Sequence, residues 1–412
     1  MRTRQRRAGW MLAATATAGA VMLSACSAPS SEAPTPTEGS WDEIVEAAQG
    51  QTVSLWMWGG DEQGNRYVDE ILAPAVAEQG VTLRRVPVSD TGDAVNRVLA
   101  ERQAGITDGD IDLVWVNGDN FATGKQAGAW LCDWTSDLPS MQYTDPDDPL
   151  LLSDFGTPVD GCEAPWHKAQ FTLVYDEARI AEPPTTLEGV LDWARENPGR
   201  FTYPAPPDFT GSVFIREVLT RVSKDVPLQH SEEAYDEHAP ALFEELNDLA
   251  PALWREGRTY PQDVEELNQL FADGQVDMTM TYGPATLTEL VANGTYPETT
   301  RVLTLDEGTV GNASFLAIPS TSGNSAGARV VANVALSPEQ QLSKAKPEVW
   351  GQFTVLDLDR LSAADQEAFE ALPSSPIVPP YEELSRNARP ELETAWVPAL
   401  DEGWRRSVLA GQ

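Results

Sequence analysis

The sequence predicts an α/β protein built as two lobes, and three observations support this fold class. Apolar strands alternate with amphipathic helices from residue 52 onward, which implies parallel strand pairing with right-handed crossovers. The same alternation starts again near Gln170, which indicates a second unit. The length of 412 residues suits two or three domains or one two-lobed body.

Local signals predict each element of the first lobe. Ser40 and Glu43 form a capping-box pattern that opens a helix near 41–49. The apolar run Thr52–Trp58 stops at Gly59 and is typical of a strand buried on both faces. Hydrophobic periodicity then predicts, in order, a helix over 68–76, a strand over 81–88, a helix over 94–99 and a strand over 111–116.

The second unit follows the same logic. Thr185 and Glu188 cap a helix that ends at Pro198, and a proline-rich loop over 204–212 leads into another helix. The remaining pattern predicts strands over 171–175, 277–282 and 315–318, and helices over 213–222, 242–253, from Ser337 onward, 365–372 and 391–406.

Composition excludes several functions. The chain has 28 Lys and Arg against 64 Asp and Glu, a net charge of −36, which argues against nucleic-acid binding. Its three cysteines lack zinc-type spacing and its three histidines limit metal chemistry, so we expect no metal or cofactor. Gly323–Gly327 matches Gly-x-Ser-x-Gly, but its flanks are polar and no histidine follows it, which favours a surface turn over a nucleophile.

The N-terminus predicts export. Residues 1–25 carry four arginines and then an apolar run too short to span a bilayer, as in a signal peptide. Leu23–Cys26 resembles the bacterial lipobox, so Cys26 is predicted to carry the lipid; the alternative is a signal peptide with a chance cysteine. Residues 26–40 lack large apolar side chains and are expected to form a tether. Whether export uses the general or the twin-arginine route stays open.

Export also bears on the other two cysteines. An oxidising compartment favours disulfides. With Cys26 lipidated, Cys132 and Cys162 are predicted to form one bridge.

The chain resembles the solute-binding lipoproteins of ABC importers, and the YnjB-type family in particular. Residues 270–277 followed by MTMTYGPA resemble the helix, strand and ligand loop of type II binding proteins, and residues 335–340 resemble a common helix start of that class. The family-like runs are WVNGDNF (115–121), DFGTPVDG (154–161), RFTYPAPPDFTGS (200–212), GTVGN (308–312) and VLDLDRL (355–361). Ala313 and the cysteine pair depart from the family pattern.

The resemblance implies a type II periplasmic-binding-protein fold, with mixed, mostly parallel sheets and a ligand cleft between the lobes. It implies lobe 1 over 41–168, completed by about 306–375, and lobe 2 over 169–305, with C-terminal helices over about 376–412 packing across both. The expected protein is extracytoplasmic, anchored to the membrane by lipid alone and monomeric. It is not an enzyme, and it docks on separate ABC permease subunits.

The ligand-binding prediction rests on strand ends and helix starts that face such a cleft. The predicted residues are Trp58, Gly59, Asp61, Asn117, Asp119, Asn120, Trp166, Asp208, Phe209, Thr210, Ser212, Tyr282 and Asn312.

Each of these residues has a plainer interpretation. Trp58 and Trp166 suit core packing, the residues after Val116 suit a turn, and Asp208 or Thr210 suits a helix cap alone.

The predicted residues also bear on the charge of the ligand. Aspartates with aromatic residues favour a small polar solute of cationic character, whereas helix N-termini would suit an anion. Two other functions stay open: a ligand-sensing or scaffolding lipoprotein, and a carboxylate-based extracytoplasmic hydrolase.

Overall fold

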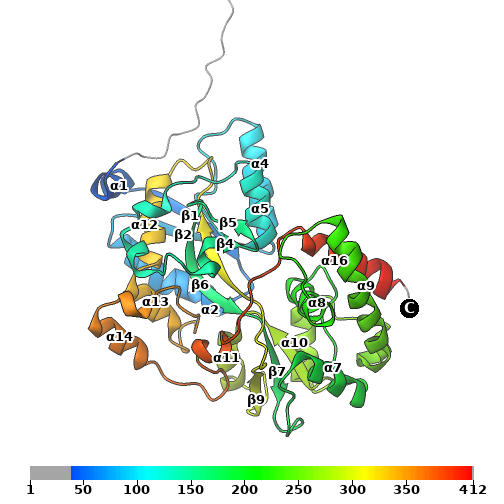
Figure 1. The fold of residues 1–412 in the computed structure, drawn as a ribbon. Coiled ribbons are helices and arrows are strands. Elements are labelled where there is room, and N and C mark those ends of the chain that lie inside the picture. The colour runs from blue at the N-terminus through cyan, green and yellow to red at the C-terminus, as the bar shows by residue number, and fades with distance from the viewer. Residues whose placement is uncertain (1–38, 411–412) are drawn as a thin grey trace, which may run out of the picture. The chain divides into compact units, whose positions relative to one another are not determined.

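Two β-sheets, each with its own helices and core, form the fold (Figure 1). A computed structural model of the chain describes residues 39–410, which all belong to one compact unit. The predicted signal peptide, Cys26 and most of the predicted tether lie outside the described residues. The five-stranded sheet has the order β2 (Thr82–Val88), β1 (Thr52–Trp58), β3 (Leu113–Val116), β10 (Gly311–Ala317) and β6 (Glu163–Gln170). The three-stranded sheet has the order β8 (Met278–Thr281), β7 (Thr172–Asp176) and β9 (Thr300–Leu303).

Strand pairing fixes where a ligand site can form. In the larger sheet β1 pairs in parallel with β2 and β3, and β10 runs antiparallel to both β3 and β6. The carboxyl ends of the three parallel strands therefore lie at one edge, where binding residues of α/β sheets gather. The smaller sheet is antiparallel throughout, with Leu173 opposite both Met280 and Leu303. The predicted mixed sheets are confirmed, and among the named strands only β1, β2 and β3 pair in parallel.

Helices cover both sheets. The α-helices are α1 (Trp41–Ala48), α2 (Glu62–Tyr67), α3 (Ala73–Ala77), α4 (Thr91–Gln103), α5 (Gly118–Gln126), α6 (Pro149–Leu152), α7 (Leu187–Glu196), α8 (Phe209–Val222), α9 (Glu232–Leu249), α10 (Val264–Ala272), α11 (Leu287–Ala292), α12 (Ser325–Ala335), α13 (Pro338–Ala345), α14 (Ala363–Glu370), α15 (Tyr381–Leu384) and α16 (Trp396–Trp404). Short 3-10 or π segments are η1 (Val68–Leu72), η2 (Thr135–Asp137), η3 (Pro139–Tyr143), η4 (Ala250–Ala252), η5 (Trp254–Gly257), η6 (Pro284–Thr286), η7 (Leu358–Arg360) and η8 (Arg405–Leu409). A short hairpin joins β4 (Ser153–Asp154) and β5 (Thr157–Pro158).

Separate hydrophobic cores define two lobes. Lobe 1 is the five-stranded sheet with the helices packed on it, and its cores include Leu55, Val114 and Phe315. Lobe 2 is the three-stranded sheet with its helices, and one large cluster joins strand residues such as Met280 to Trp404 of α16. The predicted two-lobed α/β fold is confirmed. The residue boundaries predicted for the lobes stay a prediction.

The chain crosses between the lobes three times. Phe171 separates β6 from β7, and the segment between β9 and β10 returns to the larger sheet. The third crossing precedes Ile377, which packs in the core of lobe 2 and whose carbonyl accepts the Val302 N–H at 3.0 Å. Residues 386–394, which we call the C-terminal strap, then run between the two sheets towards α16 (Figure 1). Backbone hydrogen bonds hold the strap to both lobes, because the Thr394 N–H donates to the Phe155 carbonyl of lobe 1 at 3.2 Å and the Glu393 N–H donates to the Leu228 carbonyl of lobe 2 at 2.9 Å.

Several elements, among them α16 and β6, differ from the sequence prediction. The helix predicted over 391–406 begins only at Trp396, because the preceding strap makes contacts with both lobes instead of helical hydrogen bonds. Strand β6 was not predicted, since its sequence EAPWHKAQ lacks the apolar alternation typical of strands, yet nearly all of it is buried.

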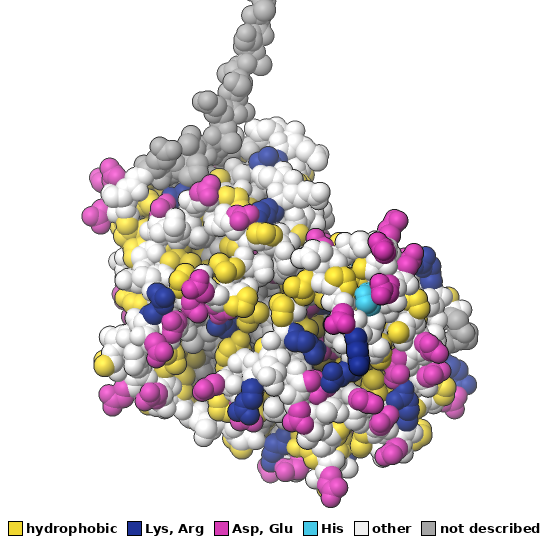
Figure 2. All heavy atoms as spheres, in the orientation of Figure 1, with side chains coloured by type: hydrophobic (Ala, Val, Ile, Leu, Met, Phe, Trp, Pro, Cys, Tyr) yellow, Lys and Arg dark blue, Asp and Glu magenta, His cyan; other side chains and the backbone are white. Residues whose placement is uncertain are grey.

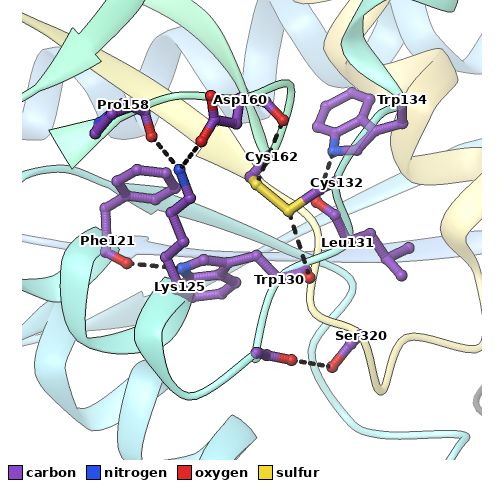
Figure 3. Close-up of a disulfide and its surroundings, with 11 residues drawn as sticks. Phe121, Lys125, Trp130, Leu131, Cys132, Trp134, Pro158, Asp160, Cys162 and Ser320 are labelled. Atoms are coloured by element: carbon purple, nitrogen blue, oxygen red, sulfur yellow. Dashed lines mark hydrogen bonds and ion pairs between the residues drawn. A yellow bond between two sulfur atoms is a disulfide. The ribbon is translucent and has the colours of Figure 1, made fainter.

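The two described cysteines lie at the edge of lobe 1. Their sulfur atoms are 1.99 Å apart, as the predicted Cys132–Cys162 disulfide requires (Figure 3). Beside them the Lys125 ammonium contacts the Pro158 carbonyl and the Asp160 carboxylate, which ties α5 to the end of the β4–β5 hairpin. Among residues 39–410, no helix is long and apolar enough to cross a membrane.

Candidate ligand-binding site

Three aromatic rings meet where the lobes meet. Phe155 lies in the β4–β5 turn of lobe 1, whereas Phe209 begins α8 and Tyr282 follows β8 in lobe 2. The Phe209 ring centroid lies 6.0 Å from that of Phe155 and 5.3 Å from that of Tyr282. Phe209 remains 44% exposed, so part of its side chain is available to a solute.

A carboxylate of the strap completes this arrangement. The Tyr282 hydroxyl donates to Glu391 Oε1 at 2.7 Å, and the Arg216 guanidinium binds both Glu391 oxygens at 3.0 Å. The Arg216 guanidinium also lies 5.7 Å from the Phe155 ring centre. Phe155, Phe209, Tyr282, Arg216 and Glu391 therefore form a closed circuit of contacts between the lobes, which we call the interlobe ring.

Two further carboxylates lie behind the interlobe ring. Asp154 accepts the Gly118 N–H at 2.7 Å through Oδ2, while its buried Oδ1 has no hydrogen-bond partner. Burial raises the pKa of Asp154 well above its usual value; the Gly118 hydrogen bond opposes this shift and the charge of Glu391 adds to it.

The neighbouring Glu163 is fully buried, with no hydrogen-bond partner for either carboxylate oxygen. Burial and then the charge of Asp154 raise the pKa of Glu163 well above its usual value, whereas Lys125 lowers it.

Carboxylate side chains occupy the N-termini of α2, α4 and α5, which follow β1, β2 and β3, and of α8, which follows the proline-rich loop. Asp61 accepts the Gly64 N–H of α2 at 3.0 Å, Asp90 accepts the Gly92 N–H of α4 at 2.7 Å, and Asp208 accepts the Gly211 N–H of α8 at 2.8 Å. Asp154 does the same for α5. These amides are therefore already bound by the protein's own carboxylates. Figure 2 shows that acidic side chains also lie scattered over this face of both lobes.

Comparison with known proteins identifies the family. Residues 70–373 match the model of the bacterial extracellular solute-binding proteins. The chain is also 36% identical over 370 residues to Protein YnjB of Escherichia coli (strain K12), covering 88% of this chain and 92% of that one. The chain belongs to this family.

Solved structures of binding proteins share the fold of this solute-binding protein. The maltose-bound T. maritima MalE3 has a TM-score of 0.64 at 15% identity, covering 88% of this chain and 95% of that one. The spermidine/putrescine ABC transporter substrate-binding protein PotD of Streptococcus pneumoniae has a TM-score of 0.58 at 16% identity, covering 86% and 98%. Both likenesses concern the fold alone.

The structure brings some of the predicted ligand residues of this family member together. Phe209 and Tyr282 share the interlobe ring, and Asp208 lies directly before Phe209. Burial raises the pKa of Asp208 to about 6 in spite of its backbone hydrogen bonds. Thr210 and Ser212 are buried in α8, where the Ser212 hydroxyl donates to Asp401 at 2.7 Å. Those two side chains therefore support α8.

The predicted residues of lobe 1 lie at its strand ends but contact other partners. Trp58 is 37% exposed at the end of β1, and the Gly59 N–H donates to the Val88 carbonyl at 2.9 Å. Asp61 caps α2 and accepts the Trp350 indole N–H at 2.6 Å. Asn117 is the N-cap of α5, whose first turn holds Asp119 and Asn120.

Trp166 is fully buried among aromatic rings. Its ring centre lies 5.3 Å from those of Trp115, His167 and Trp350, an arrangement that favours the packing interpretation over contact with a solute. Asn312 is different. It is 5% exposed at the start of β10, and neither its amide oxygen nor its amide nitrogen has a partner.

Sequence reasoning missed four residues of the site: Asp154, Phe155, Arg216 and Glu391. The first two lie in the run DFGTPVDG, which indicated membership of the family but did not indicate that these residues contact α8. Glu391 reaches Arg216 across 175 positions, and no local pattern marks such a pair.

Within residues 39–410, no group of three or more His, Cys, Asp or Glu residues could hold a metal ion. Ser325, the central residue of the Gly-x-Ser-x-Gly match, begins α12 after a loop, without the buried strand that a nucleophile elbow requires immediately before it.

Proposed function

We propose that this protein captures a small polar solute between its lobes outside the cytoplasm and delivers it to an ABC importer. The observation that carries the proposal is the interlobe ring, because its aromatic faces come from both lobes and so a bound solute would hold the lobes together. PotD and MalE3 are named for a polyamine and a sugar respectively, so the shared fold leaves the solute to be decided by local residues.

Uptake measurements test the proposal. Deleting the gene should abolish import of the solute, and expressing the wild-type protein should restore import. Tyr282→Ala should restore it poorly, because the substitution removes a ring and the hydroxyl bound to Glu391. Normal import in the deletion strain would contradict the transport role, and loss of a signalling response instead would favour the sensory alternative.

Purified protein tests the enzymatic alternative. We propose that it binds without turnover, so no glycoside or ester should be hydrolysed. Hydrolysis abolished by a single carboxylate substitution would support the hydrolase instead.

We further propose that Cys26 anchors the exported chain through lipid and that residues 26–40 act as the tether. Cells fed labelled palmitate should yield a labelled protein, and Cys26→Ser should remove both the label and membrane retention. A label that persists in Cys26→Ser would contradict the anchor.

The exported protein is also proposed to be monomeric and to contain the Cys132–Cys162 disulfide. Without reductant, a thiol reagent should label neither cysteine after unfolding. Labelling of both cysteines would contradict the proposed disulfide.

A further inference from the structure

The carboxyl groups at the lobe junction outnumber the basic groups that pair with them. Both arginines there already have carboxylate partners, since Arg216 binds Glu391 and Arg389 binds Glu217. The Lys125 ammonium binds Asp160 at 2.7 Å. None of the ion pairs among residues 39–410 includes Asp154 or Glu163, although both are at most 1% exposed. The junction therefore carries buried acid without a matching base.

An anionic solute would find few donors at this junction. The N-terminal amides of α2, α4, α5 and α8 already donate to Asp61, Asp90, Asp154 and Asp208. A helix N-terminus attracts an anion through free N–H groups and the helix dipole. A capping carboxylate already accepts a hydrogen bond from these N–H groups, and its negative charge already interacts with the dipole.

Unsatisfied polar atoms and aromatic faces favour the opposite charge. Asp154 Oδ1 is buried without a partner beside Phe155, whereas Asn312 at the lobe crossing has both an unbonded amide oxygen and an unbonded amide nitrogen and so favours neither charge. Phe209 presents an exposed ring face next to Phe155 and Tyr282. Carboxylate oxygens next to aromatic faces are a favourable environment for an ammonium or guanidinium group.

We infer that the solute is an organic cation and that Asp154 binds its positively charged group, with Phe209 and Tyr282 covering the cation. This inference rests on the proposed function, because it names the class of solute that the same interlobe site accepts. Asp154 would then exchange an unpaired, buried carboxylate oxygen for a charge-assisted hydrogen bond when the solute binds.

Small-molecule extract from bacterial cells, separated by ion exchange into cationic, anionic and neutral fractions, provides the probe. Each fraction is added to the purified protein and the melting temperature is measured, because a ligand that binds only the folded state raises it. We expect the cationic fraction to give the largest rise. A larger rise with the anionic or neutral fraction would overturn the inference while leaving solute binding intact. No rise with any fraction would contradict the proposed function, and the inference would fall with it.

Two variants test the assigned residues. Asp154→Asn keeps an oxygen that accepts the Gly118 N–H but removes the charge, so it should weaken binding of the cationic fraction by about tenfold or more. Asp357→Asn is the matched control: this carboxylate accepts the Asp359 N–H at 3.1 Å in η7, away from the interlobe ring, and binding should stay unchanged.

Phe209→Leu offers a check that does not alter a buried residue. It keeps apolar bulk at an exposed position but removes the aromatic face, so the cationic fraction should again bind more weakly. Wild-type affinity in both Asp154→Asn and Phe209→Leu would overturn the inference.

Discussion

At the scale of single residues, the buried charges without partners are the most consequential feature. Glu163 is fully buried, and its pKa is raised by burial and by Asp154. The folded state therefore holds this proton at pH values where the unfolded chain, with an ordinary glutamate pKa of about 4.3, releases it. The stability that Glu163 contributes is complete below about pH 4 and is lost as pH rises through its folded pKa.

Glu163→Gln should accordingly stabilise the protein at alkaline pH. The variant removes the cost of ionising a buried group, and we expect a gain of about 1–3 kcal/mol at pH 8 that shrinks towards pH 5. Urea unfolding at both pH values measures the gain. The exposed Glu78→Gln should show no pH-dependent difference. A Glu163→Gln protein less stable than wild type at pH 8 would contradict this account.

Lys344, a buried basic residue of lobe 1, should show a pH dependence of stability opposite to that of Glu163. Its ammonium is buried against the Trp166 carbonyl, and burial lowers its pKa well below the usual value. The unfolded chain therefore binds this proton more readily, so the contribution of Lys344 to stability falls as pH drops from about 10 towards the folded pKa.

Lys344→Met should raise stability by about 1–3 kcal/mol, and more at pH 6 than at pH 9. The Trp166 carbonyl keeps a donor in the variant, because Gln341 Nε2 also binds it at 2.9 Å. Lys224→Met, at an exposed position, is the control and should change little at either pH. Thermal unfolding at the two pH values measures the difference in stability from the wild type. A Lys344→Met protein less stable than the wild type would contradict the prediction.

Sequence analysis could predict some residues of the candidate site but not others. Phe209 and Tyr282 were predictable, because one begins a helix and the other ends a strand, and cleft residues occur at such points. Asp154 and Glu391 were not. Their role depends on the strap packing against the β4–β5 hairpin, a contact between segments more than 200 residues apart that leaves no periodic signal.

At the scale of elements, the loop closed by Cys132 and Cys162 holds part of the site. The two cysteines are 30 positions apart, and the hairpin that carries Asp154 and Phe155 lies between them. Replacing both cysteines by serine should lower the free energy of unfolding by about 3–4 kcal/mol on loop-entropy grounds.

Solute affinity should fall as well in this double variant, because the hairpin would lose one of its anchors to lobe 1. Wild-type protein treated with reductant should behave like the double serine variant in urea unfolding. Equal stability of the double variant and the oxidised wild type would contradict the prediction.

Elements with a single dominant signal were predicted well. Strand β1 is a continuous apolar run, and α8 follows a proline-rich loop with Asp208 as its cap. Strand β6 was missed because His167 and Lys168 interrupt the apolar pattern, and its backbone pairs with the distant strand β10. The helix predicted from Glu391 began five residues too early, since the Glu391 side chain binds Arg216 from the strap.

At the scale of the whole molecule, the strap lies between the lobes, and a buried ion pair joins it to lobe 2. Glu391→Gln would leave the Arg216 guanidinium, 1% exposed, without its charged partner, and we expect a loss of about 3–5 kcal/mol. Glu402→Gln in the exposed pair with Arg405 is the matched control and should cost about 1 kcal/mol or less. Urea unfolding compares the two, and similar losses would show that the strap pair stabilises no more than a surface pair.

The central claim is that a solute binds between the lobes, and its affinity for a Phe209→Ala variant tests this most directly. Phe209 and Leu409 are equally exposed, at 44%, but only Phe209 belongs to the interlobe ring. Titration calorimetry with the solute identified from the stabilising fraction should give an affinity at least about tenfold weaker for Phe209→Ala. Leu409→Ala should bind as the wild type does. Unchanged affinity in Phe209→Ala would place the site elsewhere.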